Sequence, residues 1–506
     1  MKNVLMIVLP YLQQADTATA KVKSWPSLPY GALSVASYCK DVAKIEMIDC
    51  NVTELYKYEI FRSMQEFKPE VVGFAMQFET SYPHLRKLLE IVRDVDPTVM
   101  TVIGGAATMP AYKELLEEQP LLNAVCFGEG EIPFRELLLR SKQYVWEYLI
   151  DIPSWITNTT GGLGKIPRKT LVQNLDHVVE IDYSFVDFTK YRMRQEFSPI
   201  DDVPDKKQLI VMTSRGCPFR CAFCYKSVED DRKMRYASAD KVISHVKDLI
   251  EKYGMNTLTI CDDQFMINKP RAKEILRRLA PFNLRVEMYQ GESVAYIDDE
   301  MARLMKAAGI VRAVLPIESG CREVLDKMIE KKVDLDKTKK VIQLLRKHGL
   351  WVVGLFVMGF PGETDAHRAE TVKWIQEADL DWSIFSPAIP IRGTKLYDMC
   401  LEGGYILPSR LGELDYNHYT INAPGYLAKE VEEKIYEINL MLNFVQNRTM
   451  RVKDFPTAAK IFKQVIGMFE GHAFAHFYLA LCLMQMDLKW QKYERDIFFG
   501  GGYGKN

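Results

Sequence analysis

Three cysteines within one short segment constrain this chain more than any other feature. They are Cys217, Cys221 and Cys224, in the run SRGCPFRCAFCYKS with the spacing CxxxCxxC. An apolar, strand-like segment at 208–213 leads into them, so a loop leaving a strand can present three thiols to one face of an iron–sulfur cube. No fourth Cys or His follows at ligand spacing, whereas a purely structural site usually has four ligands. The pattern predicts a cluster with one open iron, and a zinc or redox cysteine site is the alternative.

Length and composition set the scale of the fold. A chain of 506 residues, 48% hydrophobic and 26% charged, is long enough for two or three domains. The formal net charge of −1 gives no electrostatic reason to expect nucleic acid or an anionic membrane as a partner. No apolar run approaches the roughly 18 residues of a membrane span, and the apolar start ends at Pro10 without a cleavage site. With ten cysteines that look reduced, we expect a cytoplasmic protein.

Residues 1–140 alternate short apolar runs with helix-length segments, which is typical of a Rossmann-like, doubly wound parallel sheet. The apolar runs lie at 4–9, 45–48, 71–75, 101–103 and 124–127. Ligands of such sheets bind beyond the carboxyl ends of the strands. Glycines there let a bulky ligand approach the backbone, and simple turn chemistry is the alternative. Three of these ends carry Asp49, the pair Gly104-Gly105, and the turn Gly128-Glu129-Gly130-Glu131.

The periodicity weakens over 141–207, which we expect to be a linker and bridge, and it returns over 208–400. Six apolar runs alternate there with amphipathic helices, at 208–213, 257–261, 285–289, 313–317, 351–358 and 382–385. Six such units predict a partial (β/α)6 barrel, in which chemistry gathers at the carboxyl ends of the strands. Residues 401–506 are predicted to form a helical cap over the barrel, with helices at 427–450 and 456–489.

The cysteine run, the aromatic residue before its last cysteine and the six βα units together resemble the radical S-adenosylmethionine (SAM) enzymes. The resemblance implies that the three cysteines bind a 4Fe-4S cluster, whose open iron chelates SAM and cleaves it to a 5′-deoxyadenosyl radical. It also implies that residues after the fourth and fifth barrel strands contact SAM, and that the aromatic residue before the last cysteine packs near the adenine of SAM. The residues implied are Phe223, Glu318, Ser319, Gly359 and Pro361.

The features of the N-terminal region are similar to the cobalamin-binding domain of the class B radical SAM family. That family has a Pro-x-Gly entry to the first helix, an acidic residue after the second strand, a Gly-Gly pair and a Gly-Glu-Gly-Glu turn. A DxHxxG motif is missing, so cobalamin is expected without a histidine ligand to cobalt. A vestigial or nucleotide-binding domain is the alternative. The resemblance implies a cobalamin site at Pro29, Gly31, Asp49, Gly104, Gly105, Gly128, Glu129 and Gly130.

The chain departs from the family pattern after its third barrel strand. Members commonly have an arginine there that helps hold the SAM carboxylate, but this chain reads QGESVA at 290–295. Either Arg312 or another basic residue substitutes, or Glu292 faces the SAM ammonium group. Asp262 and Asp263 follow the second barrel strand and are weak candidates for acid and base. Polar groups that bind strand-end amides are an equally ordinary reading, so the catalytic residues stay unassigned.

Together these features predict a cobalamin-dependent radical SAM enzyme that methylates an unactivated carbon of a small metabolite or peptide. Its expected partner is an electron donor such as flavodoxin or ferredoxin. One alternative keeps both cofactors and forms, rearranges or oxidises a ring. A second is a tRNA methylthiotransferase, although the surroundings of Cys39, Cys50 and Cys126 do not look like ligands of another cluster. A third is a non-catalytic corrinoid-binding protein, against which the three-cysteine site argues.

Overall fold

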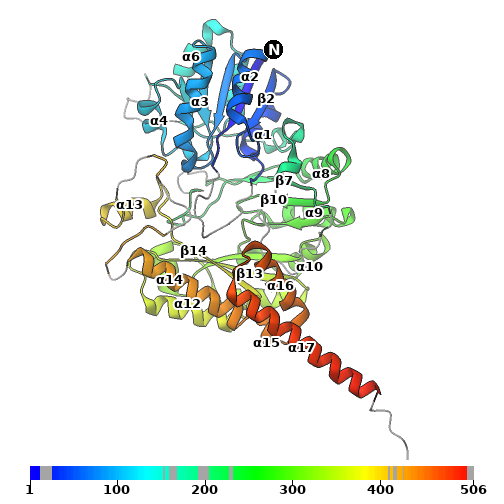
Figure 1. The fold of residues 1–506 in the computed structure, drawn as a ribbon. Helices are drawn as coiled ribbons and strands as arrows, with labels where there is room; N and C mark the ends of the chain where they lie inside the picture. The colour runs from blue at the N-terminus through cyan, green and yellow to red at the C-terminus, as the bar shows by residue number, and fades with distance from the viewer. Residues whose placement is uncertain are drawn as a thin grey trace, which may run out of the picture.

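The computed structural model describes residues 1–11, 26–151, 154–158, 168–191, 203, 205–226, 232–407, 411–413, 419–424 and 427–498. Two α/β units lie one above the other, and a helical C-terminal region packs on the lower one (Figure 1). Within the described residues no helix is both long and apolar enough to cross a bilayer. The α/β fold with a helical C-terminal region agrees with the prediction from the sequence.

The upper unit is a six-stranded sheet in the order β2-β1-β3-β4-β5-β6. All neighbouring pairs are parallel except β5 with β6, a short antiparallel strand within the segment expected to be a linker. The strands are β1 (Lys2–Val8), β2 (Ala43–Asp49), β3 (Val71–Ala75), β4 (Met100–Gly104), β5 (Ala124–Cys126) and β6 (Trp155–Ile156). The helices are α1 (Tyr30–Cys39), α2 (Tyr56–Glu66), α3 (Tyr82–Val95), α4 (Tyr112–Glu118), α5 (Glu131–Leu139) and α6 (Val145–Asp151).

The interior strand β1 is buried on both faces because helices cover both sides of the sheet. Leu5 and Ile7 join the core beneath α2, α3 and α4, whereas Met6 and Val8 join the core beneath α1 and α5. Successive strand residues point to opposite faces, so a run that is apolar without alternation fits only a strand covered on both sides.

The lower unit has six parallel strands in two groups, β7-β10-β11 and β12-β13-β14. A bridge between Val286 in β11 and Ile310, just before β12, links the groups. The strands are β7 (Gln208–Val211), β10 (Thr257–Ile260), β11 (Arg285–Glu287), β12 (Arg312–Glu318), β13 (Trp351–Met358) and β14 (Trp382–Pro387). The helices are α8 (Ala239–Tyr253), α9 (Lys269–Leu279), α10 (Asp299–Ala307), α11 (Leu335–Lys347), α12 (Asp365–Ala378) and α13 (Lys395–Glu402). A small ribbon pairs β8 (Ser214–Arg215) with β9 (Arg235–Tyr236).

Each outer strand of this partial barrel is covered by one side chain that both donates and accepts hydrogen bonds. On β7, the Tyr183 hydroxyl accepts from the Ile210 N–H at 3.1 Å and donates to the Ile210 carbonyl. On β14, the Asn443 amide accepts from the Ser383 N–H at 2.9 Å and donates to its carbonyl at 2.6 Å. These contacts satisfy backbone groups that an open sheet would leave unpaired.

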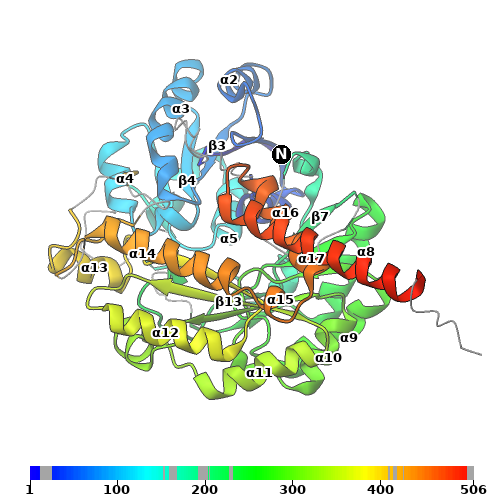
Figure 2. The same cartoon turned by 60° about the horizontal axis from the view of Figure 1, so that its bottom comes forward.

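The C-terminal helices pack at the strand starts, opposite the cysteine loop. Phe444 and Phe462 share a core with Val314, Trp351 and Trp382, which lie early in β12, β13 and β14. The expected cap therefore covers the amino-terminal end of the barrel, because the large side chains there require apolar partners. A turn divides the second expected helix, so the elements are α14 (Ala428–Leu440), the π-helix η10 (Met441–Val445), α15 (Arg448–Arg451), α16 (Phe455–Met468) and α17 (Ala473–Phe498). Helices α14, α16 and α17 run across the front of Figure 2.

Candidate active site

The carboxyl ends of the two sheets face each other. The Tyr225 hydroxyl, next to Cys224 in sequence, donates to the Ala106 carbonyl beyond β4. The Tyr30 hydroxyl, at the start of α1, accepts from the Met212 N–H beyond β7 at 3.1 Å. Ligands of both kinds of sheet bind at these ends, so a site between the units would be shared by both.

The cysteine loop is held from two directions through its buried central residue. The Ala222 N–H donates to the Ile329 carbonyl at 2.9 Å, and the Ala222 carbonyl accepts from the Leu396 N–H at 3.0 Å. Burial raises the pKa of Cys217 to about 11 and that of Cys221 to about 12. Without metal these thiols are therefore protonated, and cluster assembly must release their protons.

The fit of this loop to an iron–sulfur cluster rests on the chemistry of its donors. Among the described residues, no group of three or more His, Cys, Asp or Glu side chains is placed to hold a single metal ion. The loop does offer three partly exposed thiols, Cys217, Cys221 and Cys224, and soft thiolates are the ligands that iron–sulfur clusters require.

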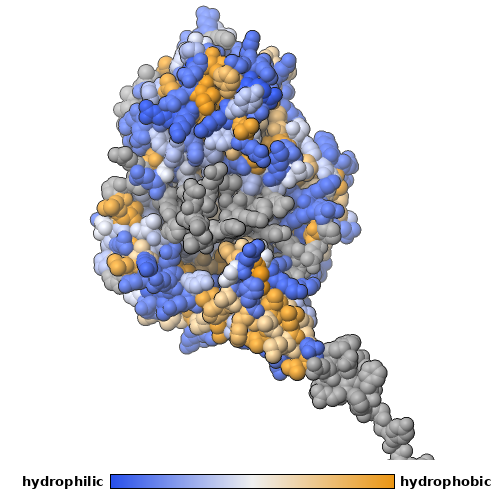
Figure 3. All heavy atoms as spheres, viewed as in Figure 1, coloured by the Kyte–Doolittle hydropathy of each residue, from blue (hydrophilic) through white to orange (hydrophobic). Residues whose placement is uncertain are grey.

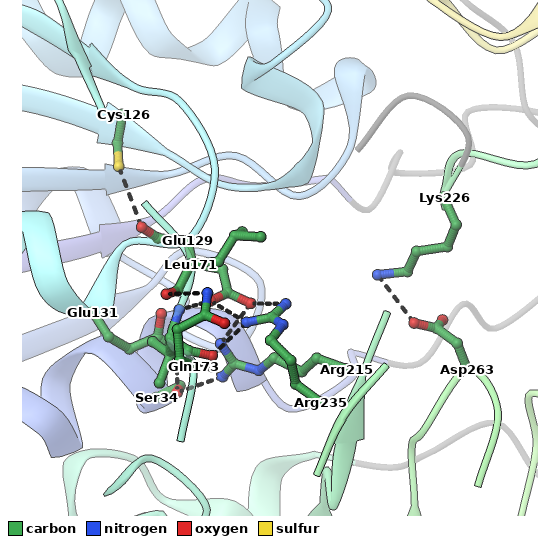
Figure 4. A network of polar contacts seen from close by, with 11 residues as sticks. Ser34, Cys126, Glu129, Glu131, Leu171, Gln173, Arg215, Lys226, Arg235 and Asp263 are labelled. Carbon is green, nitrogen blue, oxygen red and sulfur yellow. Dashed lines mark hydrogen bonds and ion pairs between the residues drawn. The ribbon is translucent and has the colours of Figure 1, made fainter. Parts of the chain in front are cut away.

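The two candidate acid–base residues differ sharply in environment. Asp262 is 2% exposed, and its carboxylate accepts from the Thr213 N–H, the Thr213 hydroxyl and the Ser214 hydroxyl at 2.5, 2.6 and 2.6 Å. It thus holds the turn that leads to the cysteines and has no access to a substrate. Asp263 is partly exposed and pairs with Lys226 at 3.2 Å (Figure 4).

Glu318 and Ser319 both lie at the carboxyl end of β12. Glu318 has a positive φ of 69°, which is uncommon outside glycine, where the register with β13 is irregular. Its carboxylate pairs with Lys331 at 2.8 Å. The Ser319 hydroxyl is buried, 3.0 Å from the Thr371 hydroxyl, and it accepts from the Cys321 N–H at 3.1 Å. The unusual backbone conformation thus sets the direction of the Glu318 carboxylate, which pairs with Lys331. The Ser319 hydroxyl, by contrast, already has hydrogen-bond partners within the protein.

The remaining predicted SAM residues form an aromatic corner beside the cysteine loop. The rings of Phe223 and Phe360 lie edge to face, 6.0 Å apart. Next to Phe360, the Gly359 N–H donates to Glu363 and the Gly359 carbonyl accepts from the Tyr419 hydroxyl. Pro361 follows and is partly exposed. The protein itself therefore uses both backbone groups of Gly359. Phe360 is fully buried, so of the two rings it is Phe223, which is partly exposed, that offers apolar surface beside the cluster loop.

Neither substitute proposed for the missing arginine lies where it was expected. Glu292 is 4% exposed and accepts from the Met266 N–H at 3.3 Å, and burial raises its pKa well above the ordinary value, so it is neutral. Arg312 lies at the start of β12, where it pairs with Glu287 at 3.3 Å. Two lysines do act on the cysteines: Lys226 lowers the pKa of Cys217, and Lys331 lowers that of Cys221, although burial outweighs both. Lys226 follows Cys224 closely in the sequence, but no local pattern marks Lys331.

The predicted cobalamin residues on β4 and α1 leave open space at two glycines. A Cβ added at Gly31 would meet nothing within 4 Å, and one at Gly104 would meet only the Cβ of Cys126 at 3.4 Å. A Cβ at Gly105 would lie 2.4 Å from the Met76 carbonyl oxygen, and Gly105 has a φ of +120°. Gly105 is therefore required by the fold itself. Pro29 is buried just before α1, the position from which the helix begins.

The two acidic residues predicted to bind cobalamin, Asp49 and Glu129, already have partners in the protein. Asp49 is 3% exposed and accepts from the Tyr191 hydroxyl at 2.9 Å and from the Asn51 N–H at 2.9 Å. Burial raises the pKa of Asp49. Glu129 lies between Gly128 and Gly130. Its carboxylate pairs with two arginines of the lower unit, Arg215 at 3.2 Å and Arg235 at 2.9 Å. Tyr191 in the bridge thus touches the upper unit, as Tyr183 touches the lower one.

Comparison with known proteins matches both units. The radical SAM superfamily matches residues 211–375, and the B12-binding domain matches residues 24–138. The chain is 28% identical over 404 residues to an uncharacterised methyltransferase, PH0819, of Pyrococcus horikoshii, covering 80% of this chain and 85% of that protein. It is 24% identical over 380 residues to the anaerobic magnesium-protoporphyrin IX monomethyl ester cyclase of Rubrivivax gelatinosus, covering 72% and 65% of the two chains.

Among solved structures, the cobalamin-dependent SAM radical enzyme OxsB, with aqua-cobalamin and SAM bound, matches all of this chain and 82% of its own at a TM-score of 0.66. The sequences are 14% identical, so this match shows a shared fold. The two domain matches and the shared architecture confirm the predicted cofactors, a 4Fe-4S cluster, SAM and cobalamin. The chain therefore belongs to the cobalamin-binding radical SAM family and is a radical SAM enzyme.

Proposed function

We propose that this enzyme transfers a methyl group to an unactivated carbon of a small metabolite or peptide. One contact carries the proposal: the hydrogen bond from Tyr225 to the Ala106 carbonyl. It joins the cysteine loop to the glycine turn beyond β4, so both predicted cofactor sites border the same space. Bound there, the cluster with SAM would supply a hydrogen-abstracting radical, and cobalamin would supply the methyl group.

The residues of the chain itself hold and screen this space. Ala222 fixes the cysteine loop, while the partly exposed Phe223, packed on the buried Phe360, offers apolar surface against an adenine. The ion pairs Lys226–Asp263 and Lys331–Glu318 place both charge signs near the cysteines. A zwitterionic amino-acid group can exchange with such pairs, so we propose that they hold the polar end of SAM.

The similarity to PH0819, which is named a methyltransferase and shares the higher identity and coverage, supports methyl transfer. The similarity to a ring-forming cyclase supports the alternative that the same cofactors close or oxidise a ring. We further propose a flavodoxin or ferredoxin as electron donor. Ten free cysteines favour a reducing compartment, and we propose the cytoplasm.

The test is anaerobic reconstitution with iron, sulfide and hydroxocobalamin, followed by product analysis with candidate substrates. Methyl transfer predicts about one S-adenosylhomocysteine and one 5′-deoxyadenosine per product, because one SAM donates the methyl group and another makes the radical. Deuterium on the substrate should appear in 5′-deoxyadenosine. A product with unchanged carbon count and no S-adenosylhomocysteine would instead support the ring-forming alternative.

A further inference from the structure

Four charged side chains join the two units close to the cysteine loop. Glu129 and Glu131 follow β5 of the upper unit, whereas Arg215 and Arg235 belong to the β8–β9 ribbon of the lower unit. We call this set the interdomain clamp, and Figure 4 shows its contacts. Arg215 stands two residues before Cys217, so the clamp lies at the root of the loop that carries the predicted cluster ligands.

The carboxylates and guanidinium groups of the clamp interlock. Arg215 binds Glu131 at 2.7 Å and Glu129 at 3.2 Å. Arg235 binds both carboxylate oxygens of Glu129 at 2.9 Å. Bidentate guanidinium–carboxylate pairs fix orientation as well as distance. The two positive and two negative charges balance, so the clamp can be buried without excess charge.

Further contacts anchor the clamp within each unit. The Ser34 hydroxyl in α1 donates to Glu131 at 2.6 Å, and the Arg235 guanidinium donates to the Val172 carbonyl at 2.6 Å. The Val172 N–H also donates to Glu129 at 2.6 Å, so the bridge segment joins the same cluster. The Glu131 side chain is 4% exposed and that of Arg235 is 3% exposed. Such enclosure keeps salt and water from weakening the pairs.

Burial by itself would raise the pKa of Glu131, but the neighbouring Arg215 outweighs burial and lowers it. Burial would likewise lower the pKa of Arg215, and the two glutamates outweigh it in the opposite direction. Glu131 and Arg215 are therefore both charged at neutral pH.

We propose that the Gly-Glu-Gly-Glu turn acts through its glutamates as a positioning device, which fixes the distance between the two cofactor sites by holding the root of the cysteine loop. The glutamates act on the barrel and not on cobalamin. The chemistry of this family needs both cofactors at a defined separation, and a misplacement of about 1 Å can reduce a rate by about 100-fold. The inference rests on the presence of both cofactors and does not depend on methyl transfer.

The test compares Glu129→Gln with a matched control, Glu377→Gln. The control removes the same charge from an exposed pair with Lys339 on the outer helices of the barrel. Both proteins are loaded with the cluster and with hydroxocobalamin, reduced, and measured for iron, corrinoid and the EPR line shape of Co(II) cobalamin. In wild type and control, the reduced cluster should couple magnetically to Co(II) and broaden its signal. The coupling should have a single value, because the two cofactors are held at one separation.

For Glu129→Gln we expect normal iron and corrinoid content but a dispersed or weakened coupling. Product formed per 5′-deoxyadenosine should fall about tenfold, since a poorly placed radical is quenched before transfer. Arg235→Lys keeps the charge but loses the bidentate geometry, and it should give an intermediate coupling. This variant decides the question if Glu129→Gln does not fold. The double variant Glu129→Gln/Arg235→Gln should be no worse than the more impaired single variant, because the two residues act as one unit.

Two results would overturn the proposal. One is a wild-type EPR coupling in both Glu129→Gln and Arg235→Lys. The other is a selective loss of corrinoid from Glu129→Gln with an intact cluster, which would make Glu129 a cobalamin contact. The EPR signature requires no methylated product, so it distinguishes failure of the clamp from failure of methyl transfer.

Discussion

Replacing Gly104 with alanine separates cobalamin binding from folding. The added Cβ would meet only the Cβ of Cys126 at 3.4 Å, an ordinary contact, and Gly104 does not have the positive φ that favours glycine. Alanine is also better tolerated than glycine in a strand, so the folding free energy should change by less than about 1 kcal/mol. If cobalamin lies against this backbone, the new methyl group must displace it.

The size of the effect follows from overpacking a close contact by one methyl group. Such a clash costs about 1–3 kcal/mol, which corresponds to about a 5- to 150-fold increase in the Kd of cobalamin. Anaerobic titration with hydroxocobalamin, followed by absorbance, measures this Kd, and iron analysis should show an unchanged cluster content.

The neighbouring substitution Gly105→Ala is the informative comparison. Here the Cβ would lie 2.4 Å from the Met76 carbonyl oxygen at a backbone conformation nearly restricted to glycine. This variant should lose stability of the upper unit by about 2 kcal/mol or more, and cobalamin binding with it. Gly467→Ala, with no atom near the new Cβ, should change neither property. A wild-type Kd for Gly104→Ala would show that the glycine pair is only a turn.

Two further predictions concern the cluster and the bridge. Replacing Cys217, Cys221 and Cys224 together with alanine should abolish cluster iron and 5′-deoxyadenosine formation while cobalamin still binds, because the thiols belong to the other unit; retained 5′-deoxyadenosine formation would contradict the cluster assignment. His245 accepts from the Ile181 N–H at 3.2 Å, and burial lowers its pKa from 6.5 to about 4. The unfolded chain therefore takes up a proton first as the pH falls, and the protein should lose about 2 kcal/mol of stability from this residue between pH 7 and pH 5. Urea unfolding of His245→Gln, which keeps an acceptor but does not titrate, should lack that loss, and an equal loss in both proteins would exclude His245 as its source.

The chain's local patterns were sufficient to predict both α/β units and the cysteine loop. Apolar runs at strand length, separated by amphipathic helices, define parallel sheets because such strands are buried on both faces. The CxxxCxxC spacing lies within one loop, so its chemistry depends on neighbours in sequence. The same holds for the glycines after β4, whose place at a strand end follows from the run before them.

Only the tertiary structure decided which charged groups meet. Arg215 and Glu131 are separated by 84 positions, and Lys331 and Glu318 by 13; no periodicity links either pair. Asp262 and Asp263 are adjacent in sequence, yet one is sealed beneath the cysteine loop and the other is partly exposed. The sequence likewise predicted that the C-terminal helices cap the barrel. Their apolar packing against Trp351 and Trp382 determines that they cover its amino-terminal end. Burial and long-range pairing determine these roles, because the same side chain serves as scaffold or as site according to what the fold places beside it.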